Sequence, residues 1–168
     1  TRQCLLNGNR GGPTQAEAEE RLRQALGFLR IVWLQDGLQN DHTDGHVDTL
    51  ARFVAPGRVV CMHPVQDDPN ASVLEQIISD LERAGLEVQT IPSPGGFKND
   101  DRELMPASYA NFFVGNQVVV VPTYDSPHDA EAVDGVGALF PGREVVGLSA
   151  RAILTGGGEF HCITQEHP

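Results

Sequence analysis

Three amphipathic stretches, each preceded by polar capping residues, predict three helices. A capping residue whose side chain accepts a backbone N–H, with Glu three positions later, is typical of a helix start. The predicted start signals are Thr14 with Glu17, Ser72 with Glu75, and Ser126 with Pro127 and Asp129. The first predicted helix runs to about Leu26 and the third to about Leu139. The second is expected to end just before Gly85, the residue that follows it.

Short apolar runs between the helices predict strands. One run follows each helix, at Arg30–Leu34, Leu86–Ile91 and Glu144–Leu148. Two pairs of runs predict hairpins: Ala51–Ala55 with Arg58–Met62 around Pro56-Gly57, and Asn111–Val114 with Val118–Val121 around Gly115-Asn116. We expect Gly115 and Asn116 to supply the positive φ of a tight turn.

The order strand–turn–strand–helix–strand therefore recurs along the chain. The helix starts at Thr14, Ser72 and Pro127 follow one another at roughly 55–58 residues, a spacing typical of repeat architectures. About two and a half units are predicted, within a single α/β region covering residues 1–168. Repeats that each bury one face against a neighbour form arrays. The loops 36–48 and 92–108 are then expected to meet at one end of the array.

Composition limits the classes of partner. The 168 residues are 40% hydrophobic, enough for one domain core, and carry a formal net charge of -11. Such a charge repels nucleic acids and anionic membranes and favours a small cationic ligand. Many soluble proteins are acidic without binding a cation, and this is the alternative explanation of the net charge. No apolar run reaches the length of a membrane span, and no signal peptide is evident. Three widely spaced cysteines form no disulfide framework and fit a cytoplasmic protein.

Two segments carry the candidate chemistry. The triplet Gly156-Gly157-Gly158 is followed by Cys162, which suggests a thiol on a loop whose backbone closely approaches a ligand. Far upstream, the segment Gly45-His46-Val47-Asp48 offers an imidazole and a carboxylate two residues apart. A thiol nucleophile needs an acid/base partner, and a cationic substrate needs carboxylates. We therefore interpret the pair of segments as a site for guanidine cleavage.

The sequence closely resembles the family of agmatine deiminases and Porphyromonas-type peptidylarginine deiminases, within the guanidine-modifying superfamily. The matching stretches are Cys4–Arg10, Asn40–Val54, Ser108–Phe113, Val120–Tyr124, Phe140–Arg143 and Gly156–Gln165. The resemblance implies a five-bladed, pseudo-fivefold α/β propeller, of which about half the blades are present here. It also implies that a further guanidinium-binding Asp lies upstream of Thr1, so the chain is expected to be a C-terminal part of the enzyme.

The resemblance implies roles for individual residues. Cys162 is expected to be the nucleophile, His46 the general acid/base, and Asp48 the carboxylate that holds the guanidinium. Asp44 and Gly157 are expected beside the substrate. The implied reaction converts agmatine and water to N-carbamoylputrescine and ammonia for polyamine and putrescine biosynthesis, without metal or organic cofactor.

Several alternatives remain at this point. His42 stands where agmatine deiminases often have an acidic residue, so free arginine or peptidyl-arginine is an alternative substrate. His46 and Asp48, with His42 or Asp44, are also residue types that bind zinc or a harder metal. A third alternative is an inactive half-enzyme or interaction module. We expect the chain to form a homo-oligomer or to bind the remainder of the same enzyme, and we assign no role to His161.

Overall fold

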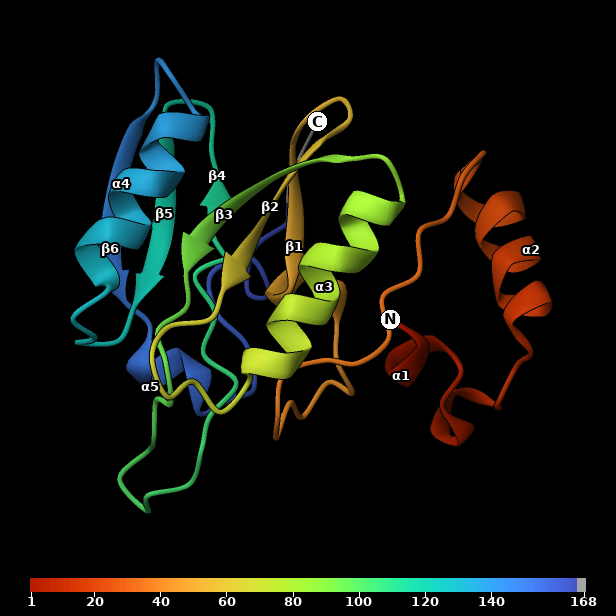
Figure 1. Cartoon of the computed structure of the whole chain (residues 1–168), viewed down its shortest axis with the longest axis horizontal. Coiled ribbons are helices and arrows are strands. Elements are labelled where there is room, and N and C mark those ends of the chain that lie inside the picture. Colours follow the sequence, from red (N-terminus) through yellow and green to blue (C-terminus); the bar gives the residue numbers. More distant parts are fainter. Residues whose placement is uncertain (166–168) are drawn as a thin grey trace.

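Two copies of one supersecondary unit form the body of the protein, whose computed structural model describes residues 1–165 (Figure 1). The first copy consists of β1 (Ala51–Ala55), β2 (Arg58–His63), α3 (Ala71–Arg83) and β3 (Glu87–Pro92). The second consists of β4 (Phe113–Val114), β5 (Val118–Thr123), α4 (Asp129–Leu139) and β6 (Glu144–Ser149). The α/β class and the strand–strand–helix–strand order predicted from the sequence are therefore confirmed for these two copies.

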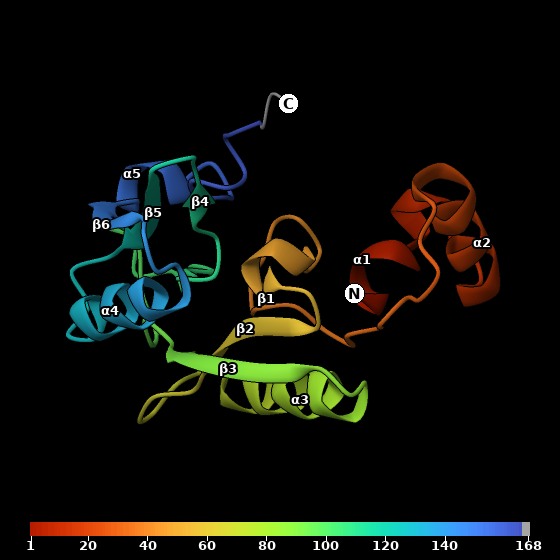
Figure 2. The same cartoon turned by 90° about the horizontal axis from the view of Figure 1, so that it is seen from above.

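Each copy makes a mixed three-stranded sheet. The first two strands are antiparallel, and the third pairs in parallel with the second, with Val59 opposite Val88 and Val119 opposite Val145. A parallel pair requires a crossover, which α3 and α4 supply. β2 is buried on both faces, as is typical of a parallel strand covered by other layers. Figure 2 shows α3 covering one face of β2 and β3.

The face of α3 that covers the sheet follows from its apolar spacing. Leu74, Ile77 and Leu81 lie three or four residues apart, so they share one side of the helix, and all three are buried. The helix ends as predicted, because Gly85 has a φ of +73° and its N–H donates to the carbonyl of Glu82.

The predicted starts of α3 and α4 are wrong in detail. α3 begins at Ala71 after Asn70, so Ser72 and Glu75 do not form a capping box. α4 begins at Asp129, two residues after the expected first position, Pro127. Ser126 instead begins a turn, in which its hydroxyl accepts the N–H of His128 and its own N–H donates to the Asp129 carboxylate. Local side-chain hydrogen bonds of this kind compete with helix formation.

The N-terminal arm lies beside β1 and contains α1 (Arg2–Leu5), the 3-10 helix η1 (Gly8–Arg10) and α2 (Gln15–Leu26) (Figure 2). Thr14 and Glu17 form the predicted capping box of α2. The strand expected at Arg30–Leu34 is not formed. Within residues 1–165, backbone bonds reach this stretch only at its end, where the N–H of Arg2 donates to the carbonyl of Leu34 at 2.8 Å. A strand without a neighbouring strand has no ladder to stabilise it.

The second hairpin also differs from its prediction. β4 has two residues only, and neither Gly115 nor Asn116 has a positive φ. The turn closes through a bond from the N–H of Gly115 to the carbonyl of Val118. Asn111 is not part of β4, and its side-chain amide bonds to Asp48 and Cys162. In the part of the chain that the structure describes, no helix is both long and apolar enough to span a bilayer.

Candidate functional site

Three separate loops form the candidate site. The first and third line a cavity of about 560 Å³, whereas the second contributes Asn111, which bonds to Asp48 and Cys162. The first loop ends in the 3-10 helix η2 (Val47–Thr49) and precedes β1, and the second, 108–111, precedes β4. The third follows the short helix α5 (Arg151–Leu154) after β6. The lining residues are Thr43, His46, Asp48, Ile153, Gly156, Gly157, Gly158, His161, Cys162, Ile163 and Thr164. Four of the five predicted site residues, Cys162, His46, Asp48 and Gly157, therefore share one cavity.

One oxygen of Asp48 is the centre of the polar contacts. Its Oδ2 accepts from Nδ1 of His161 at 2.7 Å and from Nδ2 of Asn111 at 3.0 Å. The thiol of Cys162 donates to the same oxygen at 3.3 Å, and Nδ2 of Asn111 lies 3.3 Å from Sγ. A thiol, an imidazole and an amide thus gather around a single carboxylate oxygen.

The protonation states of this group follow from its contacts. Burial disfavours the charged form of Asp48, but bonds from His161, Cys162 and Asn111 outweigh it and lower the pKa of the carboxyl group. Burial raises the pKa of the Cys162 thiol, and the Asp48 charge raises it further. The site therefore holds a carboxylate beside a protonated thiol.

His46 lies on the cavity wall and has its own partner. Its Nε2 is 3.1 Å from a guanidinium nitrogen of Arg10. A guanidinium only donates hydrogen bonds, so Nε2 of His46 is the acceptor of this bond. The backbone is a 3-10 turn that begins at His46, not an extended strand in which His46 and Asp48 would share a face. Both side chains nevertheless reach the cavity.

Asp44 and His42 lie at the edge of this arrangement. Asp44 is not among the residues, described within 1–165, that line the cavity, and its Oδ2 accepts from Nδ2 of Asn9 at 2.7 Å. His42 is exposed and lines a neighbouring cavity with Asp41 and Glu103. A Cβ built on Gly157 would lie 3.5 Å from the Cβ of His42, so these two residues are in contact across the boundary between the two cavities.

The structure gives no support to a metal centre at these residues. Within residues 1–165, no group of three or more His, Cys, Asp or Glu side chains is arranged to hold a metal ion. His46 faces Arg10, whereas Asp48 faces His161 and Cys162.

Gly158 is required by the close packing of the thiol. A Cβ at this position would lie 2.7 Å from Cβ and 2.8 Å from Sγ of Cys162, closer than atoms normally approach. We expect Gly158→Ala to lower the free energy of unfolding by about 1–3 kcal/mol, the usual cost of overpacking, as measured by urea denaturation. Gly8→Ala is the control, because a Cβ there meets nothing within 4 Å. Equal stability of the two variants would contradict this close contact.

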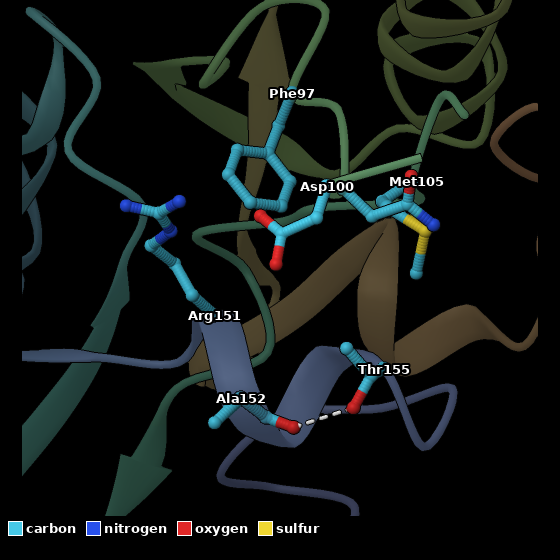
Figure 3. Close-up of a pocket in the computed structure, with 7 residues that line it drawn as sticks. Phe97, Asp100, Met105, Arg151, Ala152 and Thr155 are labelled. Atoms are coloured by element: carbon cyan, nitrogen blue, oxygen red, sulfur yellow. Dashed lines mark hydrogen bonds between the residues drawn. The ribbon is translucent and has the colours of Figure 1, made fainter. Parts of the chain in front are cut away.

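A second, smaller cavity of about 180 Å³ lies on another side of α5 (Figure 3). Phe97, Asp100 and Met105 line it from the loop 93–108, and Arg151, Ala152 and Thr155 line it from α5 and the residue after it. The guanidinium of Arg151 pairs with Asp125 at 2.6 Å. The five predicted site residues all lie in the described part of the chain, and none of them lines this cavity.

Sequence reasoning missed three side chains of the site. Asn111 was expected in a hairpin strand, but it is fully buried and bonds to Asp48 and Cys162. His161 and Glu159 were left without a role. His161 precedes Cys162 directly, and this adjacency is the signal that it reaches the same cavity. Glu159 is fully buried, whereas an isolated glutamate in a glycine-rich segment is expected at the surface.

Comparison with known proteins supplies a family. The model of the family described as "Porphyromonas-type peptidyl-arginine deiminase" matches residues 1–168. The agmatine deiminase of Pseudomonas aeruginosa (strain LESB58) is 38% identical over 193 aligned residues, which cover 100% of this chain and 52% of that protein. The chain spans about half the length of the curated relatives it matches.

Solved structures of similar proteins agree with the fold. The agmatine deiminase of Enterococcus faecalis superposes with a TM-score of 0.89 at 28% identity, over 99% of this chain and 52% of that one. A substrate-bound agmatine deiminase variant of C. jejuni superposes with a TM-score of 0.87 at 28% identity, over 95% and 49%.

Proposed function

Because this chain belongs to the Porphyromonas-type peptidyl-arginine deiminase family, we propose that the full-length protein hydrolyses a guanidino group and that agmatine is its substrate. The observation that carries the proposal is the contact of the Cys162 thiol with Asp48 and Asn111 beside an open cavity. We also propose that the two units described above are part of a five-bladed propeller in a cytoplasmic enzyme of polyamine biosynthesis.

Substrate binding follows from the charge of Asp48. A guanidinium is planar and cationic, and a carboxylate holds it through charge-assisted hydrogen bonds. Asp48 remains ionised because its bonds lower its pKa. A bound cation offsets the Asp48 charge that raises the pKa of the Cys162 thiol, so substrate arrival favours the thiolate where it is needed.

The chemical steps require one nucleophile and one acid/base. The Cys162 thiol passes its proton to an imidazole, and the thiolate forms a bond to the guanidinium carbon. The imidazolium gives this proton to one nitrogen, which leaves as ammonia. The remaining thiouronium is attacked by water, whose proton the same imidazole accepts. The C–S bond then breaks, the hydroxyl proton of the adduct passes to the sulfur, and the products are N-carbamoylputrescine and the thiol. The imidazolium gives its remaining proton to solvent. We assign the imidazole to His46, whose Nε2 is an acceptor at the cavity, whereas Nδ1 of His161 donates to Asp48 at 2.7 Å.

The names of the relatives and of the family give two guanidino substrates. The relatives named above are agmatine deiminases, whereas the family description names peptidyl-arginine. His42 places an imidazole, instead of a carboxylate, at the boundary of the cavity. Ammonia release from agmatine, free arginine and a peptidyl-arginine, assayed with one enzyme preparation, decides among them. Turnover of arginine or peptide alone would overturn the agmatine assignment.

An inactive half-enzyme is the second candidate for the 168-residue chain alone, and an exposed apolar surface favours it. Leu29 is 97% exposed and Phe53 is 67% exposed. Phe53, Phe28 and Trp33 border a cavity of about 520 Å³ between the N-terminal arm and β1. Apolar surfaces of this kind usually contact a partner or promote association.

We therefore expect the 168-residue chain, prepared alone, to associate with increasing concentration and to release no ammonia from agmatine. Light scattering together with the ammonia assay measures both properties. Phe53→Ser should weaken the association, whereas Leu148→Ser on β6, which is half exposed and lies outside this surface, is the control. A monomer that turns agmatine over at an ordinary enzymatic rate would contradict this expectation.

A further inference from the structure

The carboxyl group of Glu159 is buried directly behind the candidate site and is not used by the proposed reaction. It is 0% exposed, although it lies only three residues before the exposed Cys162. Its Oε1 accepts from the hydroxyl of Tyr124 at 2.8 Å and from the N–H of Ser108 at 3.2 Å. Its Oε2 is buried without a hydrogen-bond partner among the described residues.

Ser108 connects Glu159 to the rest of the site. The hydroxyl of Ser108 donates to the carbonyl of Thr49, in the 3-10 helix that carries Asp48, and its carbonyl accepts the N–H of Asn111. Asn111 in turn accepts the N–H of His161 and lies against Sγ of Cys162. Glu159 and Asn111 therefore attach the loop 156–162 to the loop 108–111 at two points.

The surroundings of Glu159 favour its uncharged form. Burial, followed by the charges of Asp48 and Asp41, raises its pKa to about 8 despite the bonds from Tyr124 and Ser108. An uncharged carboxyl leaves one buried Oε2–H without a partner, which costs far less than a buried charge. The phenol of Tyr124 also remains protonated, because burial and Glu159 raise its pKa.

We propose that Glu159 is a positioning residue, whose uncharged carboxyl group holds the loop 156–162 on the loop 108–111 and so places the Cys162 thiol beside Asn111 and Asp48. Ionisation adds a negative charge to a site that already contains Asp48 and faces Asp41. The charged carboxylate then gains from reaching water, and the loop that carries the thiol loosens. This inference rests on the proposed function, in which Cys162 is the nucleophile. The experiment that tests the positioning role of Glu159 needs no substrate.

The test follows alkylation of the Cys162 peptide by iodoacetamide between pH 6 and 9.5, using mass spectrometry. For the wild-type protein we expect two steps in the rate, one near pH 8 from loosening of the loop and a higher one from ionisation of the thiol. Glu159→Gln, which keeps an uncharged acceptor, should lose the lower step and keep the wild-type rate at pH 7. Glu159→Ala should react several-fold faster than wild type at pH 7.

Glu75→Gln removes the same charge from an exposed position on α3 and should behave as the wild-type protein does. A Glu159→Gln profile that superimposes on the wild-type profile would overturn the proposal, and so would a wild-type rate at pH 7 for Glu159→Ala. If the alanine variant does not fold, the comparison of the Glu159→Gln and wild-type profiles alone decides. Absence of deiminase activity would leave this result unaffected and would count against the proposed function only.

Discussion

Replacing Cys162 by serine in the full-length protein is expected to reduce turnover of agmatine by about a thousandfold or more. A serine hydroxyl has far too high a pKa to become the attacking anion, and Asp48 beside it opposes ionisation further. The side chain is exposed on the cavity, so the substitution should leave the fold unchanged. Ammonia release gives the rate, and circular dichroism checks the fold.

Cys61→Ala is the matched control for this variant. Cys61 is completely buried in β2, and burial raises the pKa of its thiol to about 12, so it is an inert core residue. The control should lose stability and keep the turnover per folded molecule. Loss of activity in Cys61→Ala at wild-type folded fraction, together with a Cys162→Ser protein that retains activity, would reverse the assignment.

Replacing His46 by alanine is expected to have the second-largest effect, about a hundredfold or more on turnover, because both ammonia departure and water attack need the imidazole. The loss should be accompanied by a covalent adduct if adduct hydrolysis becomes the slow step. His161→Ala is the informative comparison, since His161 also lines the cavity but bonds to Asp48. Accumulation of adduct in His161→Ala alone would transfer the acid/base role to His161.

The repeat and the helices were predictable because they follow local periodicity. Leu74, Ile77 and Leu81 specify one helix face, and the hairpin of β1 and β2 follows from alternating apolar runs. The strand at Arg30–Leu34 failed for a non-local reason, since an apolar run becomes a strand only where another strand pairs with it. Ser72 and Ser126 are not helix caps, because each helix begins two residues away from its expected start. A cap must directly precede the first helical residue.

The residues that take part in the proposed reaction could be predicted from the sequence. The residues that only hold the loops of the site together could not. Cys162, His46 and Asp48 are the residue types that the reaction needs, and the structure brings them to one cavity. Asn111 and Glu159 act through contacts between loops whose paired residues lie 51 positions apart in sequence, and such contacts leave no local pattern. Asp44 was predicted beside the substrate because it is close in sequence to His46 and Asp48. Its backbone is left-handed, with φ of +64°, and its side chain bonds to Asn9 instead.

The most direct measurement of the central claim is intact-mass spectrometry of the full-length His46→Ala protein after mixing with agmatine. With adduct hydrolysis as the slow step of this variant, we predict a protein whose mass has increased by agmatine minus ammonia, with the modification on the peptide that contains Cys162. The same mixing with a protein that also carries Cys162→Ser should give no adduct. An adduct that persists in the double variant, or that maps to Cys4 or Cys61, would contradict the assignment of Cys162 as the nucleophile of a guanidine hydrolase.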